Sequence, residues 1–217
     1  MYSHYNLTSN IGYRDGKVPR KFFQEDGFYS TSNSLDNLYQ RDNERRTINQ
    51  LLNLDSNSDA GHLTAKGDFV YAFQQLATFH YVNSAPQWAS FNGGNWNELE
   101  ISVRDLADST SSNLEVYTGV YGTTTLRNAN NFQKTPLFLH TINGNNLMPV
   151  PQLFWKIIYN RQNVICRDVS DRITWFNNKM KRQKHNTELG YIYACSVANF
   201  CGRTTHCPLL NVKNVLL

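Results

Sequence analysis

Three polar segments between residues 59 and 100 carry side chains that could cleave a phosphodiester bond. His62 follows Asp59-Ala60-Gly61, Asn83 opens residues 83–87, and Asn92 and Glu100 share the next polar segment. The pKa of histidine lies near neutrality, so His62 can accept a proton from water. A carboxamide oxygen, together with waters held by a carboxylate, can bind a hard divalent cation. The pattern predicts hydrolysis assisted by one metal ion.

A helix is predicted to position the last two of these side chains. Over residues 92–107 apolar residues recur at helical spacing: Trp96, Leu99, Val103 and Leu106. Asn92 is well suited to cap the start of this helix. Asn92 and Glu100 would then lie near one face, with Trp96 packing between them.

The remaining elements are predicted from apolar periodicity and turn signals. Residues 36–52 favour a helix, and residues 69–71 and 77–82 favour extended chain. Further strands are expected over residues 114–121, 135–140 and 153–159, with a turn at Asn143-Gly144 between the last two. Residues 190–195 are expected to form a short strand or the start of a helix.

Bulk composition limits the partners. The chain has 217 residues, 40% of them apolar, and a formal net charge of +4. No apolar run reaches membrane-spanning length, so no membrane partner is predicted. The charge permits a polyanionic partner without requiring one, and the basic run at residues 177–188 favours a solvated loop over a phosphate-contacting patch. The sequence fixes no oligomeric state.

Four cysteines cluster in the last quarter of the chain, at positions 166, 195, 201 and 207. Such a set favours one or two disulfides and an oxidising compartment, with free thiols as one alternative. A zinc site formed by Cys195, Cys201, His206 and Cys207 is the other, although the usual pair spacing is absent. The preferred pairing is Cys166 with Cys195, followed by Cys201 with Cys207. The N-terminus shows no secretory signal, so an upstream signal or an incomplete chain is expected.

The segments at residues 59–68, 83–87 and 91–100 resemble, in their order and spacing, the DNA/RNA non-specific endonucleases of the ββα-metal class. The likeness is greatest to arthropod secreted nucleases that degrade double-stranded RNA. It continues through residues 116–126 and 150–159. The resemblance implies an α+β fold, a central, mostly antiparallel sheet flanked by helices, with a ββα-metal motif over residues 59–106. It also implies a polar, loosely structured N-terminal segment at 1–35 and an endonuclease domain at 36–217.

The resemblance assigns roles residue by residue. His62 would be the general base, Asn92 the one direct protein ligand of Mg²⁺ or Mn²⁺, and Glu100 the holder of metal-bound waters. Asn83 would position the site. The implied substrates are RNA and DNA, because such a site contacts backbone rather than bases.

The chain departs from the family pattern in three places. Ala60 replaces an arginine expected to clamp the scissile phosphate, and Arg45, Arg46 or Lys66 could substitute, although a surface role is preferred for each. The loop at residues 55–59 is shorter than in the family pattern, which puts in question the hairpin that presents His62. Residues 159–166 leave no room for a further strand. The expected function is an active metal-dependent endonuclease, and the alternative is an impaired paralogue that binds nucleic acid without efficient cleavage.

Overall fold

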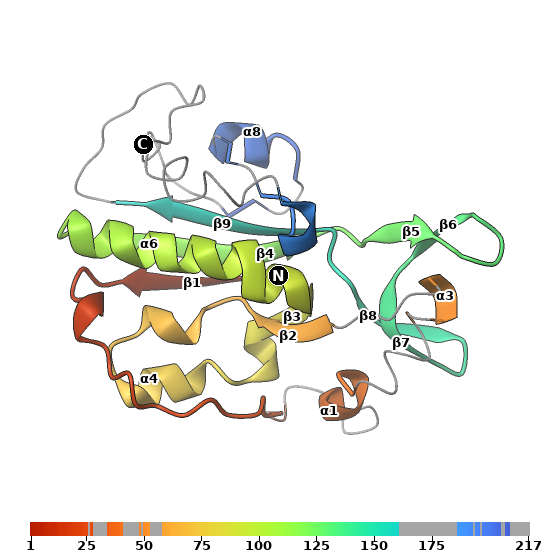
Figure 1. Cartoon of the computed structure of the whole chain (residues 1–217), viewed down its shortest axis with the longest axis horizontal. Helices are drawn as coiled ribbons and strands as arrows, with labels where there is room; N and C mark the ends of the chain where they lie inside the picture. The colour runs from red at the N-terminus through yellow and green to blue at the C-terminus, as the bar shows by residue number, and fades with distance from the viewer. Residues whose placement is uncertain are drawn as a thin grey trace.

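A three-stranded antiparallel sheet forms the centre of the molecule in this computed structural model (Figure 1). The structure describes residues 1–25, 27, 34–40, 48, 50–52, 58–160, 186–192, 194–195, 197–204 and 207–208. The sheet order is β1-β4-β9, with β1 at Tyr2–Leu7, β4 at Leu114–Tyr121 and β9 at Leu153–Tyr159. The strands predicted at residues 114–121 and 153–159 are therefore confirmed, and so is the antiparallel α+β class.

The long helix α6 (Asn97–Ser109) lies along one face of this sheet (Figure 1). Its apolar side chains pack with alternate residues of the strands to form the main core: Tyr5, Leu7, Ile11, Trp96, Leu99, Val103, Ala107, Leu114, Val116 and Ile192. Burying this amphipathic face is what stabilises the helix, since helices gain most of their stability from tertiary packing.

The predicted helix over residues 92–107 is present but not uniform. It comprises α5 (Ala89–Phe91), a π-helical turn η5 (Asn92–Trp96) and α6, with non-helical backbone at Gly94. A Cβ on Gly94 would stand 2.9 Å from Leu189, so glycine allows the 3-10 turn η6 (Thr187–Leu189) to pack against the kink. The predicted role of Asn92 as the cap at the start of the helix is wrong, because Asn92 is the first residue of the π turn and the N-cap of α6 is Trp96.

The hairpin that carries His62 is formed, although the segment at residues 55–59 before it is short. Strand β2 (Ser58–His62) pairs antiparallel with β3 (Ser84–Trp88), and His62 lies opposite Ser84. Between these strands the chain folds into η3 (Lys66–Asp68), α4 (Ala72–Ala77) and η4 (Tyr81–Asn83). The order β2, β3, α6 is the expected ββα arrangement.

Two further antiparallel hairpins extend from the sheet on the right of Figure 1. They are β5 (Thr125–Arg127) with β6 (Lys134–Pro136), and β7 (Phe138–Ile142) with β8 (Asn145–Pro149). Asn143 and Gly144, both with positive φ, form the turn between β7 and β8 rather than between the two predicted strands. Leu137 and Leu139 bury the base of these hairpins against Ile48 and Val150.

Three predictions of local structure are wrong. The helix predicted over 36–52 is interrupted after α1 (Leu35–Leu38), because Tyr39 and Gln40 are not helical; a short helix α3 occupies Gln50–Leu52, and residues 41–47 lie outside the described residues. The segment at 77–82 forms no strand: Ala77 ends α4, Tyr81 begins η4, and His80 between them makes an isolated parallel β-bridge with Gln24. The described part of residues 190–195 has no regular structure.

The N-terminal residues contribute to the same core as the predicted domain. Strand β1 pairs with β4 along its whole length, and the turn η1 (Ile11–Tyr13) buries Ile11. Residues 1–35 thus contain a strand of the central sheet, while the division of the chain at residue 36 stays a prediction. Within the described residues, every helix is too short or too polar to cross a lipid bilayer.

Candidate active site

The β2–β3 hairpin fixes the spacing of the predicted site residues. Asp59 lies opposite Gln87, and Gly61 lies opposite Ala85. A Cβ on Gly61 would come within 2.1 Å of the Gln87 side-chain oxygen, so only glycine lets Gln87 lie across the strand. The glycine before His62 is therefore required by packing in this hairpin.

The His62 ring is held by aromatic side chains. Its centroid lies 4.7 Å from that of Phe23 and 5.0 Å from that of Phe79, which meets it edge-on. Its Nε2 is buried and has no hydrogen-bond partner. Burial, reinforced by the charge of Arg20 and then of Lys66, lowers the pKa of His62 to about 4, while Asp68 opposes the shift. The imidazole is neutral at physiological pH, which is the form that accepts a proton.

Asn83 clamps the backbone that leaves His62. Its Oδ1 accepts from the Thr64 amide at 2.9 Å, and its Nδ2 donates to the carbonyls of Thr64 (2.9 Å) and Thr78 (3.0 Å). Both ends of the carboxamide are thus used on backbone groups. Asn83 positions the loop after His62, in line with the positioning role that the resemblance implies.

Replacing Asn83 with alanine is expected to lower the free energy of unfolding by about 1–3 kcal/mol, because buried backbone groups of Thr64 and Thr78 lose their partners. Asn83→Asp should lose at least as much, since a carboxylate oxygen would face the carbonyl oxygens of Thr64 and Thr78 in place of the donating Nδ2. Urea denaturation followed by tryptophan fluorescence measures both. An unchanged midpoint in Asn83→Ala would contradict the clamp.

Asn92 is bound to the same hairpin through Asp59. Its Nδ2 donates to Asp59 Oδ2 at 2.9 Å. Because a carboxylate can only accept, this bond fixes which end of the amide faces Asp59 and turns the Asn92 oxygen away from it. Asp59 is a positioning residue that the sequence did not single out, although it lies three residues before His62.

Glu100 lies beside a buried group of charges between α6 and the sheet. Asp68 accepts from the Tyr5 hydroxyl and from Arg104 Nη1, the latter at 2.7 Å. Lys156 donates to Thr118 Oγ1 at 2.7 Å and lies over the Trp96 ring. Burial raises the pKa of Glu100 to about 7; Lys156 and Arg104 oppose that shift and Asp68 adds to it.

This group of charges links the site residues. Asp68 raises the pKa values of both His62 and Glu100, so its charge acts on the predicted base and on the predicted holder of metal waters. No hydrogen bond between described residues joins the His62 ring directly to Asn92 or Glu100. Sequence reasoning missed Asp68, Arg104 and Lys156; the position of Arg104, one helical turn after Glu100, was the available signal.

The cations predicted to replace the missing arginine have different surroundings. Lys66 donates to the carbonyl of Val18, so its ammonium is already engaged. Arg45 and Arg46 lie outside the described residues. Arg20, which the sequence did not single out, is exposed and close enough to His62 to lower its pKa. It belongs to residues 18–24, the segment that also lays Phe23 on His62.

The donor set fits a hard divalent cation. The Asn92 oxygen is directed away from Asp59, and Glu100 lies in the first turn of α6, beyond the kink at Gly94. Oxygen donors of this kind suit Mg²⁺, which keeps several of its waters. Among the described residues no cluster of three or more histidine, cysteine or carboxylate side chains could hold a metal, so a site here rests on one carboxamide with water-mediated support.

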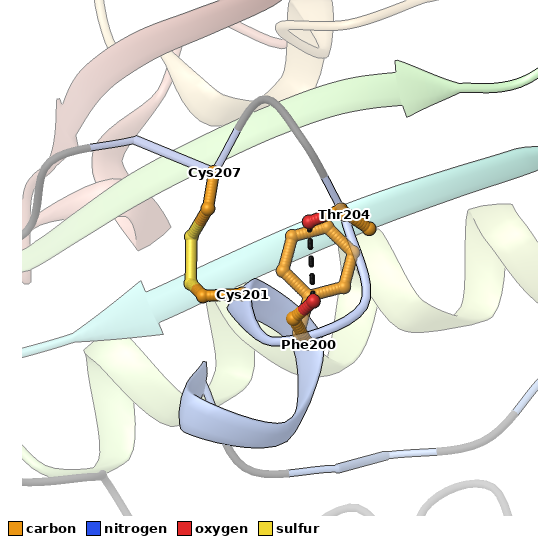
Figure 2. Close-up of a disulfide and its surroundings, with 4 residues drawn as sticks. All are labelled: Phe200, Cys201, Thr204 and Cys207. Atoms are coloured by element: carbon orange, nitrogen blue, oxygen red, sulfur yellow. Dashed lines mark hydrogen bonds between the residues drawn. A yellow bond between two sulfur atoms is a disulfide. The ribbon is translucent and has the colours of Figure 1, made fainter.

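The cysteine prediction is decided in part. Cys201, at the end of α8 (Val197–Cys201), forms a disulfide with Cys207, and Thr204 Oγ1 donates to the Phe200 carbonyl at 3.1 Å beside it (Figure 2). This disulfide rules out the predicted zinc site, which needed both thiolates. Cys195 is exposed with a free thiol, and its preferred partner Cys166 lies outside the described residues. The preferred pairing of Cys195 with Cys166 is therefore wrong, because the Cys195 thiol is free.

Comparison with known proteins defines the class of this fold and site. The family model for DNA/RNA non-specific endonucleases matches residues 1–200, and the chain belongs to this family. It is 28% identical to a salivary endonuclease of Lutzomyia longipalpis over 94% of this chain and 54% of the relative. A salivary endonuclease of Culex quinquefasciatus is 32% identical over 48% of this chain and 27% of the relative. The chain thus spans about half the length of the first relative and about a quarter of the length of the second.

A solved structure is also similar. The crystal structure of the EndoG/EndoGI complex, which concerns the inhibition of EndoG, matches with 25% sequence identity and a TM-score of 0.45. The match covers 72% of this chain and 58% of that chain.

Proposed function

We propose that this protein is a metal-dependent, sugar-non-specific endonuclease that hydrolyses phosphodiester bonds in double- and single-stranded RNA and DNA. The observation that carries the proposal is the Asn92–Asp59 hydrogen bond, which directs a carboxamide oxygen outward from the hairpin that bears His62. Family membership and the similarity to salivary endonucleases support it.

Each of the site residues has a separate role in the proposed reaction. His62 would accept the proton of the attacking water, and its buried Nε2 forms no hydrogen bond with a described residue. Asp59 orients Asn92, which would hold Mg²⁺ or Mn²⁺ directly, and Glu100 would hold waters of the ion. The ion would supply positive charge to the phosphate oxygens as negative charge develops. Asn83 holds the loop after His62 in place.

Arg20 is the proposed phosphate clamp. It lies near His62, is exposed, and its guanidinium can bind two phosphate oxygens at once. Lys66, Arg45 and Arg46 remain weaker proposals. We also propose an oxidising, extracellular compartment, which the Cys201–Cys207 disulfide supports.

The proposal is tested by incubating the protein with duplex RNA and closed circular plasmid DNA, in Mg²⁺ and in EDTA. Internal cuts in both substrates, lost in EDTA, are expected. Asn92→Ala should require a higher Mg²⁺ concentration for half-maximal cleavage, while Asn97→Ala, a matched carboxamide at the start of α6, should not. Binding without cutting would favour the impaired paralogue instead.

The Mg²⁺ requirement should also depend on pH. Glu100 must be ionised to hold waters of the cation, and its pKa of about 7 means that protons compete below neutrality. Ionisation rises about tenfold between pH 6 and pH 8, so Mg²⁺ affinity should rise by about the same factor. Titration calorimetry at the two pH values measures it, and Glu100→Gln should remove the difference.

A further inference from the structure

The β5–β6 hairpin is exposed on both faces. All three residues of β5 are exposed, β6 is exposed except for Thr135, and Phe132 between the strands is 74% exposed. A short two-stranded ribbon of this kind has little stability of its own in water. We call residues 125–136 the β5–β6 arm. In Figure 1 it projects beyond the β2–β3 hairpin, which carries His62.

The arm places two cations together. Arg127 and Lys134 are direct cross-strand partners in the β5–β6 register. Like charges directly opposite one another destabilise a sheet. Neither side chain forms an ion pair with a described residue, and residues 116–160 contain no aspartate or glutamate at all. The arm is therefore complementary to an anion that the described chain does not supply.

The tip of the arm is ordered by its own polar side chains. Asn128 Oδ1 accepts from the Asn130 amide at 2.8 Å, and the Phe132 amide donates to the Asn128 carbonyl at 2.8 Å. Phe132 has a φ of +59°, a conformation that is unfavourable for a bulky side chain. An exposed aromatic ring held at an unfavourable φ is typical of a contact surface rather than of a simple connection.

The arm also contacts α3 and the apolar cluster beside the β2–β3 hairpin. The Ala129 amide donates to the Leu51 carbonyl in α3, the helix that precedes β2 in the sequence. At the base, the Thr124 amide donates to the Val150 carbonyl at 2.8 Å. Leu137, just after β6, belongs to the apolar cluster against which Trp88 of β3 packs. These contacts hold the arm at a set position relative to the strand that carries His62.

We propose that the β5–β6 arm binds the backbone of double-helical nucleic acid away from the scissile bond, with Arg127 and Lys134 on phosphates and Phe132 against a groove. This inference rests on the proposed function and names duplex as its substrate class. A two-stranded ribbon fits the major groove of B-form DNA. A duplex is stiff over about 150 base pairs, so it reaches a remote arm without the ordering cost that a single strand bears.

The test compares Arg127→Gln/Lys134→Gln with Arg14→Gln/Lys17→Gln, a pair of exposed cations with the same loss of charge near η1. Binding of a 30-base-pair duplex is measured in EDTA at several salt concentrations. Each lost phosphate contact lowers the slope of log K against log salt by about 0.9. The arm variant should therefore lose about 1.8, and the control variant should keep the parent slope.

The variant Phe132→Gly distinguishes a loss of duplex contact from a loss of folding stability. Glycine relieves the positive φ, so thermal stability should hold or rise while duplex affinity falls about fivefold or more. An unchanged affinity in both arm variants, or equal losses in the control pair, would overturn the proposal. Equal losses with a single-stranded oligonucleotide of the same length would assign the arm to single strands and overturn the duplex claim.

Hydrolysis of bis(p-nitrophenyl) phosphate, which is too small to reach the arm, is measured alongside. Unchanged hydrolysis by the arm variants, with weaker duplex binding, is the expected result. If the parent cleaves neither this ester nor nucleic acid while the arm variants still lose duplex affinity, the proposed function fails and the arm assignment stands. Lower ester hydrolysis in the arm variants would overturn the assignment to a remote contact.

Discussion

Replacing His62 with alanine is expected to lower the cleavage rate of duplex RNA and plasmid DNA by about 10²–10⁴-fold, the usual contribution of a positioned general base. Duplex binding in EDTA should be unchanged, since His62 acts on water and not on the substrate's charge. His4→Gln is the matched control, because His4 pairs with Glu115 on the sheet, outside the site. A loss of less than tenfold in His62→Ala would show that another group accepts the proton.

The pH profile of the parent tests the same assignment. Burial, with Arg20 and Lys66, lowers the pKa of His62 to about 4, and the neutral ring is the active form. At saturating Mg²⁺ the rate should therefore stay constant as the pH falls through 6.5 and decline only near pH 4. An ordinary histidine would give a decline near pH 6.5. A decline there would contradict the lowered pKa of the His62 ring.

Replacing Arg20 with alanine is expected to cost about a hundred- to a thousandfold in rate, the usual effect of losing one charge contact to the transition state. Arg20→Lys should recover only part, because an ammonium cannot bind two phosphate oxygens in one plane. The adjacent exposed cation gives the control, Lys21→Ala, which should resemble the parent. Removing Arg20 should also raise the pKa of His62 and shift the acid limb of the pH–rate profile to higher pH.

Ala60→Arg completes the Arg20 test. Ala60 packs against the apolar cluster of Leu35, Leu38 and Tyr81, so an arginine there must run its stem over that cluster to reach the site. In the parent the substitution should change the rate by less than tenfold, because Arg20 already supplies the charge. In the Arg20→Ala background it should restore activity. A large gain in the parent, with no loss in Arg20→Ala, would show that the arginine position is empty.

Local sequence patterns predicted the elements whose stability is mostly local or periodic. The alternation in residues 114–121 and 153–159 predicted β4 and β9, and the helical spacing of Trp96 and Leu99 predicted α6. The same rules failed at residues 77–82, where β-forming side chains are used in a turn. Phe79 and Tyr81 there pack against Phe23, which lies far away in the sequence. Tertiary burial overrode the local preference.

The sequence by itself determined the order of His62, Asn83, Asn92 and Glu100, and with it the family and the ββα arrangement. The residue types and their spacing carried that information. Only the tertiary structure decided which groups act on them: Asp59 binds Asn92, the charge of Asp68 acts on His62 and Glu100, and the charge of Arg20 acts on His62. Those neighbours are brought in by long-range contacts such as Phe23 on His62, which no local periodicity encodes. The proposal that Arg20 replaces the arginine missing at position 60 depends on such a contact, in a segment that the sequence treated as a loop.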